Sequence, residues 1–286
     1  MAALLAASAA ALFGALAVSI RIALRSGADP DAGSLVTTVV ACAIGGGLAA
    51  VFREWTRVPW SETWPFFLSG SFAPGVSQIL FTRAVGAIGP TRTAILVGVS
   101  PVLSAGIAIA LLDEPLRVPL VVGTLFVVGG GTLLSWRRGP LPALFTVGAV
   151  MAVTSAALFA VRDNIARWAE RSNDVPGVVA SVCSLAAATL VMVVVVAARG
   201  RFGTRVRAAR RPFLVSGAIY GVASACVLAA FDRGRVIVVS PLVATESLWA
   251  VLASALVLRR TEAIGVRLLT AAVLVVTGGA LVGGFR

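Results

Sequence analysis

The sequence predicts an all-α polytopic membrane protein with ten transmembrane helices, arranged as two inverted five-helix repeats. Three observations lead to this prediction: the composition, a series of long neutral segments, and a similarity between the two halves. The 286 residues are 59% hydrophobic and 13% charged, with a mean hydropathy of +0.99, whereas a soluble domain carries about a quarter charged residues. The composition therefore indicates an integral membrane protein.

Each predicted helix is a segment without charges that is long enough to cross a bilayer. A hydrocarbon core of about 30 Å requires about 20 residues at about 1.5 Å per residue. Nine neutral segments meet this requirement, at residues 2–20, 32–52, 63–82, 93–112, 118–136, 139–161, 175–198, 212–231 and 268–285. A tenth, at about 236–258, meets it if Glu246 near its centre is accepted. Ten such helices would use nearly the whole chain.

The two halves of the sequence match in several places. When Glu114 is aligned with Glu262, Gly130 falls on Gly278. Upstream, and after a small gap, the segment "FTRAVGAIGP" resembles "FDRGRVIVVSP". Similarity of this kind indicates an internal repeat. We predict a first repeat over residues 1–138 and a second over 139–286.

An odd number of helices in each repeat has a topological consequence. After five crossings the second repeat enters the membrane from the opposite side, so the two repeats are inverted relative to each other. Inverted repeats are typical of secondary transporters, whose two halves exchange outward-open and inward-open shapes around a site near the bilayer midplane. The repeat therefore predicts a transporter that works by alternating access.

The charged residues are consistent with the membrane as a partner and not with nucleic acid. All 24 basic residues are arginine, the formal net charge is +12, and most of the arginines fall in short segments between the predicted spans. Arginines in such loops face anionic lipid headgroups. The three cysteines fall in three different spans, which indicates buried small side chains and neither a disulfide nor a metal site.

The residue inventory argues against an enzyme and against a cofactor. The chain has no histidine, which excludes a Ser-His hydrolase, a His-ligated zinc protease and a haem protein with His ligation. The aspartates lie at the ends of predicted helices, so no pair of facing aspartates is expected within the bilayer. A Walker motif is also absent from the sequence. We therefore expect no catalytic residues, no metal, no cofactor and no ATP hydrolysis.

Longer patterns resemble a known family. In the first half "GPTRTAILVGVSPVLSAGIAIALLDEPL" is followed by "VGTLFVVGGG", and the second half contains "SPLVATESLWAVLASALVLRRTEAIG". Together with the ten-helix plan, these segments resemble the EamA repeats of the drug/metabolite transporter superfamily over essentially the whole chain. The resemblance implies a central cavity lined mainly by the third, fourth, eighth and ninth helices, with help from the first and sixth. Trp249 departs from the pattern, because the family often has a proline there.

Glu246 is the first candidate for substrate binding or coupling. An ionisable group within a span costs about 2.5–3.5 kcal/mol on insertion scales and usually faces a cavity or a partner. On a helical period Trp249 lies on the same face, and Ser240 and Thr245 lie nearby. A carboxyl group in these apolar surroundings could carry a proton or bind a substrate amine. The alternative is a structural hydrogen bond or an ion pair to an arginine at a helix end.

Four further residues are candidates for the same cavity. Gln78 is the one amide in its neutral span and follows Pro74 by one turn, although close helix packing explains its position equally well. Arg21 lies near the end of the first predicted helix, where it can also snorkel to the headgroups. Arg162 and Asp163 lie at the end of the sixth, where an interfacial salt bridge is the alternative.

Small residues recur every fourth position in the eighth predicted helix, where we expect them to let a neighbouring helix approach closely. They are Gly217, Gly221, Ala225 and Ala229.

The function expected from these observations is secondary transport of a small organic metabolite across the cytoplasmic membrane. An amino acid, an amine or a drug-like solute is compatible with the sequence, export is the expected direction, and proton coupling through Glu246 is a hypothesis. The alternative is a lipid flippase or a non-transporting membrane scaffold. Either a monomer or a homodimer is compatible with the sequence.

Two lines of argument give opposite orientations of the protein in the membrane. Assigning the loops alternately places 15 arginines on the side of "RGRFGTRVRAARR" and 9 on the side of both termini. Because arginine is commoner in cytoplasmic loops, this count places the termini outside. The family resemblance implies termini in the cytoplasm.

Overall fold

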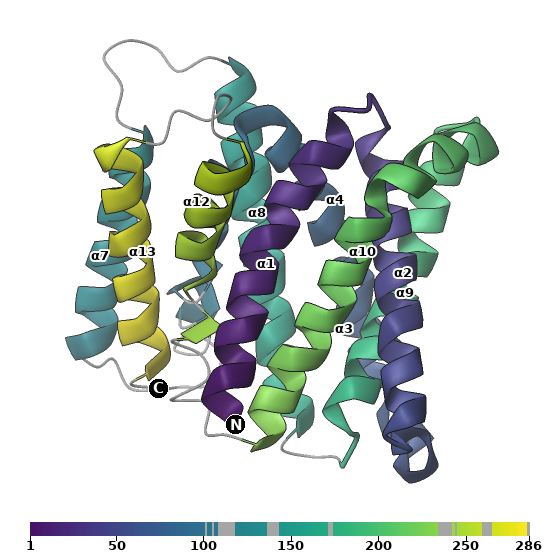
Figure 1. Cartoon of the computed structure of the whole chain (residues 1–286). Coiled ribbons are helices and arrows are strands. Elements are labelled where there is room, and N and C mark those ends of the chain that lie inside the picture. Colours follow the sequence, from purple (N-terminus) through teal and green to yellow (C-terminus); the bar gives the residue numbers. More distant parts are fainter. Residues whose placement is uncertain are drawn as a thin grey trace.

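The structure is a computed structural model, and it describes most of the chain. The described residues are 1–100, 102–104, 106–107, 118–135, 143–170, 174–233, 242–243, 245–258 and 265–284. They form a bundle of helices (Figure 1). The helices are α1 (Ala2–Leu24), α2 (Pro30–Val51), α3 (Trp64–Phe72), α4 (Gly75–Ile88), α5 (Pro90–Val97), α7 (Val118–Ser135), α8 (Ala143–Glu170), α9 (Gly177–Ala198), α10 (Phe202–Arg233), α12 (Glu246–Val257) and α13 (Val266–Gly284), with two short 3₁₀ turns, η1 (Glu54–Arg57) and η2 (Trp60–Glu62).

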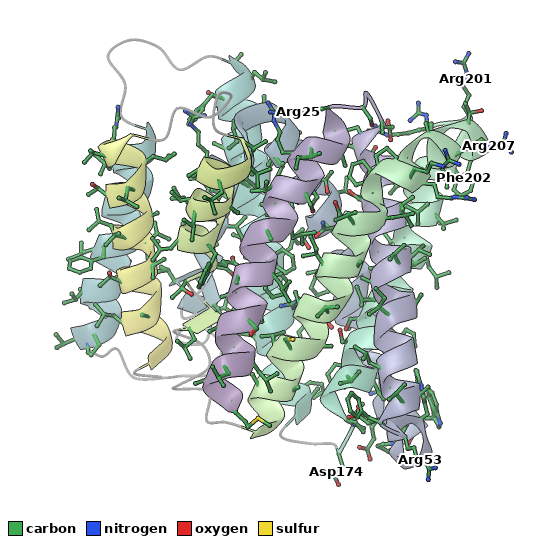
Figure 2. All side chains as sticks on the ribbon, viewed as in Figure 1. Arg25, Arg53, Asp174, Arg201, Phe202 and Arg207 are labelled. Carbon is green, nitrogen blue, oxygen red and sulfur yellow. The ribbon has the colours of Figure 1, made fainter. Side chains whose placement is uncertain are left out.

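The helices run roughly parallel to one axis, so that the bundle has two ends (Figure 2). Arg25 and Arg201 lie at one end, which we call the Arg25 end, and Arg53 and Asp174 lie at the other, the Arg53 end. The helix α1 runs toward the Arg25 end, whereas α8 runs away from it, because the chain reaches Asp174 soon after α8. Both α1 and α13 have their chain termini toward the Arg53 end (Figure 1).

Four of the described helices are long and apolar enough to cross a membrane. These are α1, α2, the Ala143–Arg162 part of α8, and α9. Large apolar side chains on their outer faces are exposed, including Leu190 at 67% and Val194 at 67%. Such side chains face lipid tails in a membrane protein, which confirms the prediction of an integral multi-pass membrane protein.

The helix α2 begins where the sequence provides the signals for a helix start. Asp29 is the N-cap, and its carboxylate accepts hydrogen bonds from the backbone N–H groups of Asp31 at 3.1 Å and Ala32 at 3.0 Å. Pro30 occupies the first helical position, where its missing N–H costs nothing. This start fixes the two aspartates at the Arg25 end of the bundle.

The predicted third span, residues 63–82, is two helices in the structure. The helix α3 ends at Phe72, Ala73 is extended, and α4 begins at Gly75. Proline lacks the backbone N–H that would continue the hydrogen-bond ladder, so Pro74 accounts for the interruption. A second change occurs at Gly89, whose φ of +88° ends α4 in a conformation that glycine adopts without strain.

Helices from the two halves of the chain alternate across the bundle. The helix α10 packs between α1 and α2, and α4 packs against α8, while α3 and α4 both contact α9. Near the C-terminus, α13 packs along α7, and α12 lies against α1 and α5. The two halves are therefore interleaved along most of their length, and the interior is formed jointly.

Candidate functional site

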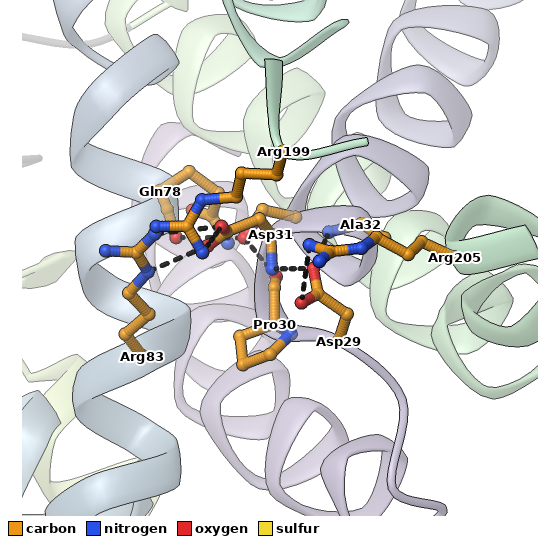
Figure 3. A network of polar contacts seen from close by, with 9 residues as sticks. Asp29, Pro30, Asp31, Ala32, Gln78, Arg83, Arg199 and Arg205 are labelled. Carbon is orange, nitrogen blue, oxygen red and sulfur yellow. Dashed lines mark hydrogen bonds and ion pairs between the residues drawn. The ribbon is translucent and has the colours of Figure 1, made fainter. Parts of the chain in front are cut away.

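A cluster of charged side chains joins three helices at the Arg25 end (Figure 3). Its centre is Asp31, which is 1% exposed. Arg83 of α4 donates to both carboxylate oxygens, with Nε 2.7 Å from Oδ1 and Nη2 2.8 Å from Oδ2. Arg199, at the end of α9, places Nη1 2.7 Å from Oδ2. The buried carboxylate is thus paired with two guanidinium groups, and that of Arg83 binds it in the bidentate geometry for which arginine is suited.

A second ion pair lies beside this cluster. Nη1 of Arg205, in the first turn of α10, lies 3.3 Å from Oδ2 of Asp29. Arg199 and Arg205 belong to the second half of the chain, whereas both aspartates belong to the first. These two pairs therefore tie the halves of the chain together at the Arg25 end.

Buried polar side chains lie on α2 and α4 next to the cluster. The Ser34 hydroxyl donates to the backbone carbonyl of Gln78 at 3.4 Å, which connects the two helices. Gln78 lies beside Asp31 in Figure 3 and is 2% exposed, and its side-chain Nε2 has no hydrogen-bond partner among the described residues. The same holds for four buried hydroxyl groups, those of Thr37, Thr38, Ser77 and Thr82.

Unpartnered polar groups are unusual in a protein interior, because each costs about 1–3 kcal/mol when it is cut off from water. Gln78 and Thr82 share one face of α4 at a spacing of four residues, and Ser34 and Thr38 share one face of α2 in the same way. The resulting set of donors and acceptors follows directly after the interruption at Pro74. It can bind water or a polar solute, and it carries no charge of its own.

A third set of side chains comes from α1, α8 and α10. The guanidinium carbon of Arg162 lies 4.9 Å from the ring centroid of Phe159, an arrangement in which a cation is attracted to an aromatic face. Tyr220 of α10 packs edge-on against Phe13 of α1 with ring centroids 6.3 Å apart. Arg162 is half-buried.

Comparison with known proteins gives a family for the first half of the chain. Residues 1–136 match the family model described as "EamA-like transporter family". The chain carries an EamA domain. This match and the exposed apolar helices support a multi-pass membrane protein whose first half is similar to transporters of the drug/metabolite transporter superfamily.

The similarity to a solved structure extends over both halves of the chain. A solved structure described as "Crystal structure of protein" matches 98% of this chain and 95% of its own, with 21% sequence identity and a TM-score of 0.60. It is one of 16 matching chains. At this identity the similarity shows the fold alone. No curated protein sequence matches the chain.

Glu246 is the first residue of α12 and does not lie in the middle of an unbroken helix. Thr245 is the N-cap, and its hydroxyl donates to the carbonyl of Leu242 at 2.6 Å. A carboxylate in the first turn is stabilised by the positive end of the helix dipole. Glu246 is half-buried and Trp249 is 38% exposed. Ser240 lies outside the described residues.

The α12 segment meets α1 closely. A Cβ added to Gly14 of α1 would lie 2.6 Å from the backbone nitrogen of Ala250 and 2.7 Å from Cβ of Trp249. On the other side of α12, the buried Ser247 hydroxyl donates to the carbonyl of Ala94 in α5 at 3.1 Å. The first turns of α12 therefore lie between the first helix and the α5 segment, two of the elements that the family resemblance assigns to a cavity.

The guanidinium group of Arg21 donates hydrogen bonds to backbone carbonyls of the protein. Its Nη1 donates to the backbone carbonyls of Gly86 at 2.6 Å and Val85 at 3.4 Å. These carbonyls belong to the last turn of α4, where the Val85 carbonyl also accepts from the N–H of Gly89. A cation at this end complements the helix dipole. Arg21 therefore stabilises the end of α4, and a contact with substrate stays a prediction.

The structure brings the predicted residues together only in part. Gln78 belongs to the buried polar set, Arg162 is half-buried beside Phe159, and Trp249 lies against α1. Nothing is described for the side chain of Asp163. Within the described ranges, no three cysteine, aspartate or glutamate side chains gather in a way that could hold a metal ion.

The cluster around Asp31 was not predicted. Asp31 follows the N-cap Asp29 in the sequence, and an aspartate in the first turn of a helix usually needs no other explanation. One signal was present in the sequence, since the repeat aligns Arg83 with Arg233, which marks Arg83 as a position that both repeats keep basic.

Proposed function

We propose that this EamA protein is a secondary transporter that exports a small organic metabolite across the cytoplasmic membrane by alternating access. An amino acid, an amine or a drug-like solute fits the uncharged polar set on α2 and α4 together with the aromatic side chains around Arg162. The proposal includes the two inverted five-helix repeats, 1–138 and 139–286, as the units that move relative to each other. The protein acts as a monomer or a homodimer.

The pattern of helix contacts is the observation that carries this proposal. If α8 corresponds to α1, α9 to α2, and α10 to the interrupted pair α3 and α4, then each contact should have a counterpart. The packing of α10 on α1 has its counterpart in α4 on α8, and that of α10 on α2 in α3 and α4 on α9. Contacts between corresponding helices, α2 with α9 and α7 with α13, join the halves symmetrically. This is the pattern expected for a pseudo-twofold arrangement.

The direction of the helices supports the same proposal. The helix α1 runs toward the Arg25 end and its counterpart α8 runs away from it, while α2 ends near Arg53 and its counterpart α9 ends near Arg199 (Figure 2). Corresponding helices therefore run in opposite directions, as inverted repeats require. When the two repeats exchange shapes, an outward-open conformation becomes an inward-open one.

The ion pairs at the Arg25 end suggest which side is closed. Arg199 with Asp31 and Arg205 with Asp29 connect the two halves at this end. Opening toward the Arg25 end would require these contacts to separate. The structure is accordingly proposed to represent the state that is closed at the Arg25 end.

Flux measurements in proteoliposomes test the proposal. Purified protein would be reconstituted with a pH gradient and tested with radiolabelled amino acids, quaternary amines and nucleosides. We expect protein-dependent flux of at least one class. If Glu246 couples transport to protons, Glu246→Gln abolishes the dependence of flux on the gradient, while the control Glu62→Gln, in the η2 turn, retains it.

Three outcomes would contradict parts of the proposal. If Glu246→Gln transports like the wild type with the same pH dependence, the proton-coupling step is wrong. If no solute moves while labelled lipids exchange between leaflets, the protein is a lipid flippase, and if neither moves, it is a scaffold without transport.

A further inference from the structure

Along one face of α10, the exposed side chains change from basic to apolar at Pro212. The part after Pro212 carries exposed apolar side chains, with Leu214 at 44%, Val215 at 61% and Val222 at 41% exposure. The part before it, residues 202–211, carries exposed arginines at positions 207, 210 and 211. Helices that expose leucine and valine in this way face lipid tails, so the boundary marks the depth at which hydrocarbon gives way to headgroups.

The arginines and the apolar side chains lie on the same face. Residues 207, 211, 214 or 215, and 222 are spaced by three, four and seven positions, which places them in one row along a helix. At about 1.5 Å per residue, Arg211 lies about 6 Å and Arg207 about 12 Å from Val215 along the axis. The row therefore passes from tails to the headgroup layer within about two turns.

The opposite face of the same segment is occupied by the protein. Arg205 pairs with Asp29, and both Ala209 and Phe213 are fully buried. Arg207 and Arg201 instead project away from the bundle at the Arg25 end (Figure 2). The helix thus separates its arginines by face, with one neutralised inside and the others directed outward.

The outward arginines lack acidic partners in the part of the chain that the structure describes. Arg201, Arg207, Arg210 and Arg211 form no ion pair there, and both nearby aspartates, Asp29 and Asp31, are already engaged by other arginines. We call these four arginines the basic face. Phe202, 37% exposed, lies next to Arg201, in keeping with the preference of aromatic rings for the membrane interface.

The geometry points to the basic face as a binding site for the phosphate headgroups of anionic membrane lipids. A cluster of four arginines next to a span attracts an anionic leaflet by about 1 kcal/mol for each residue near the surface. Continuity with the lipid-facing row of α10 favours a lipid over a soluble phosphate, because only a lipid can contact both parts of the row at once. The headgroup replaces the acidic partners that the protein does not provide.

Native mass spectrometry of the full chain in detergent can measure this binding. Phosphatidylglycerol would be titrated against phosphatidylcholine, with the wild type and a variant carrying Arg207→Gln, Arg210→Gln and Arg211→Gln. We expect the wild type to prefer phosphatidylglycerol and the triple variant to lose about tenfold or more of this affinity. A second triple variant with lysine at the three positions keeps the charge and should keep most of the preference. Arg53→Gln, at the Arg53 end, should leave it unchanged.

Several results would overturn the proposal. A wild type that binds both lipids equally has no anionic-lipid site, and a glutamine variant with undiminished preference places the site elsewhere. Inorganic phosphate is added in a separate titration, and full competition at low millimolar concentration would identify a site for small anions instead of lipids. Because the assay measures lipid binding, its result is independent of whether the protein transports a solute.

Discussion

At the scale of single residues, Asp31 is the centre of the charged cluster at the Arg25 end. Its carboxylate is buried and accepts from two arginines on different helices. A charge in this position is stable only while its partners remain, because an uncompensated charge in a low-dielectric interior is costly. The arginine charges depend less on the ion pairs, because the side chains of Arg83 and Arg199 are 26% and 47% exposed and can reach water or headgroups.

We predict that Asp31→Asn lowers the free energy of unfolding by about 2 kcal/mol. Removing one partner of a fully buried ion pair costs about 3–5 kcal/mol. We expect a smaller loss here, because solvent screens the partly exposed arginines. Thermal unfolding in detergent would show a lower midpoint. Asp29→Asn is the matched control, since asparagine caps a helix as well as aspartate does and only the 3.3 Å pair with Arg205 is lost. Equal midpoints for the two variants would contradict the central role of Asp31.

The sequence predicted some of the polar residues and missed others for a physical reason. Gln78 stood out because an amide in an apolar span must find a partner or a cavity. Asp31 and Arg83 were not connected, because their contact depends on how α2 and α4 pack, and no local pattern encodes the distance between residues 52 positions apart. The orphan hydroxyl groups of Thr37 and Thr82 were equally hidden, since threonine in a span usually bonds to its own helix.

At the scale of elements, the neutral segments predicted where helices lie but not where they break. Predicted segments 2–20, 32–52 and 175–198 agree closely with α1, α2 and α9. The segment 63–82 appeared continuous because a neutral segment is defined only by the absence of charged residues. The interruption between α3 and α4 depends on Pro74, whose effect is on the backbone and not on hydropathy.

Close packing of α10 on α2 was predictable from small residues, and it gives a second prediction. A Cβ at Gly217 would lie 2.5 Å from Cβ of Val40 and 3.0 Å from the carbonyl oxygen of Thr37. We expect Gly217→Ala to destabilise the protein by about 1–3 kcal/mol, as overpacking does. Gly203 lies in the same helix with nothing within 4 Å of an added Cβ, and Gly203→Ala should raise stability by up to about 1 kcal/mol through helix propensity. Unfolding midpoints that fall or rise together would contradict the packing explanation.

At the scale of the whole molecule, the sequence indicated two similar halves but not how they interleave. Self-similarity identifies which helices correspond, whereas the choice of neighbours depends on the shapes of complete helix faces. The structure adds that arginines from several loops gather at the Arg25 end, opposite the ends of α1 and α13 that carry the termini. The positive-inside tendency therefore favours a cytoplasmic Arg25 end, in agreement with the arginine count and in contrast to the family resemblance.

The ion pairs between the halves give the last prediction, which rests on the proposed alternating access. In a background in which Cys42, Cys183 and Cys226 are replaced by alanine, cysteines at positions 29 and 205 would be joined by a reducible bifunctional thiol reagent. Because Asp29 and Arg205 belong to different halves and meet at the Arg25 end, the link should hold this end closed and stop flux in proteoliposomes. Reduction of the link should restore it.

A matched pair of cysteines at positions 31 and 83 separates closure from damage to the cluster. These positions lie at the same end and are in contact through their side chains, but both belong to the first half. If the halves move as units, linking 31 to 83 leaves the flux of that variant unchanged. Undiminished flux in the linked 29–205 variant would mean that the Arg25 end does not open during transport, and substrate would have to pass without separating the two halves there.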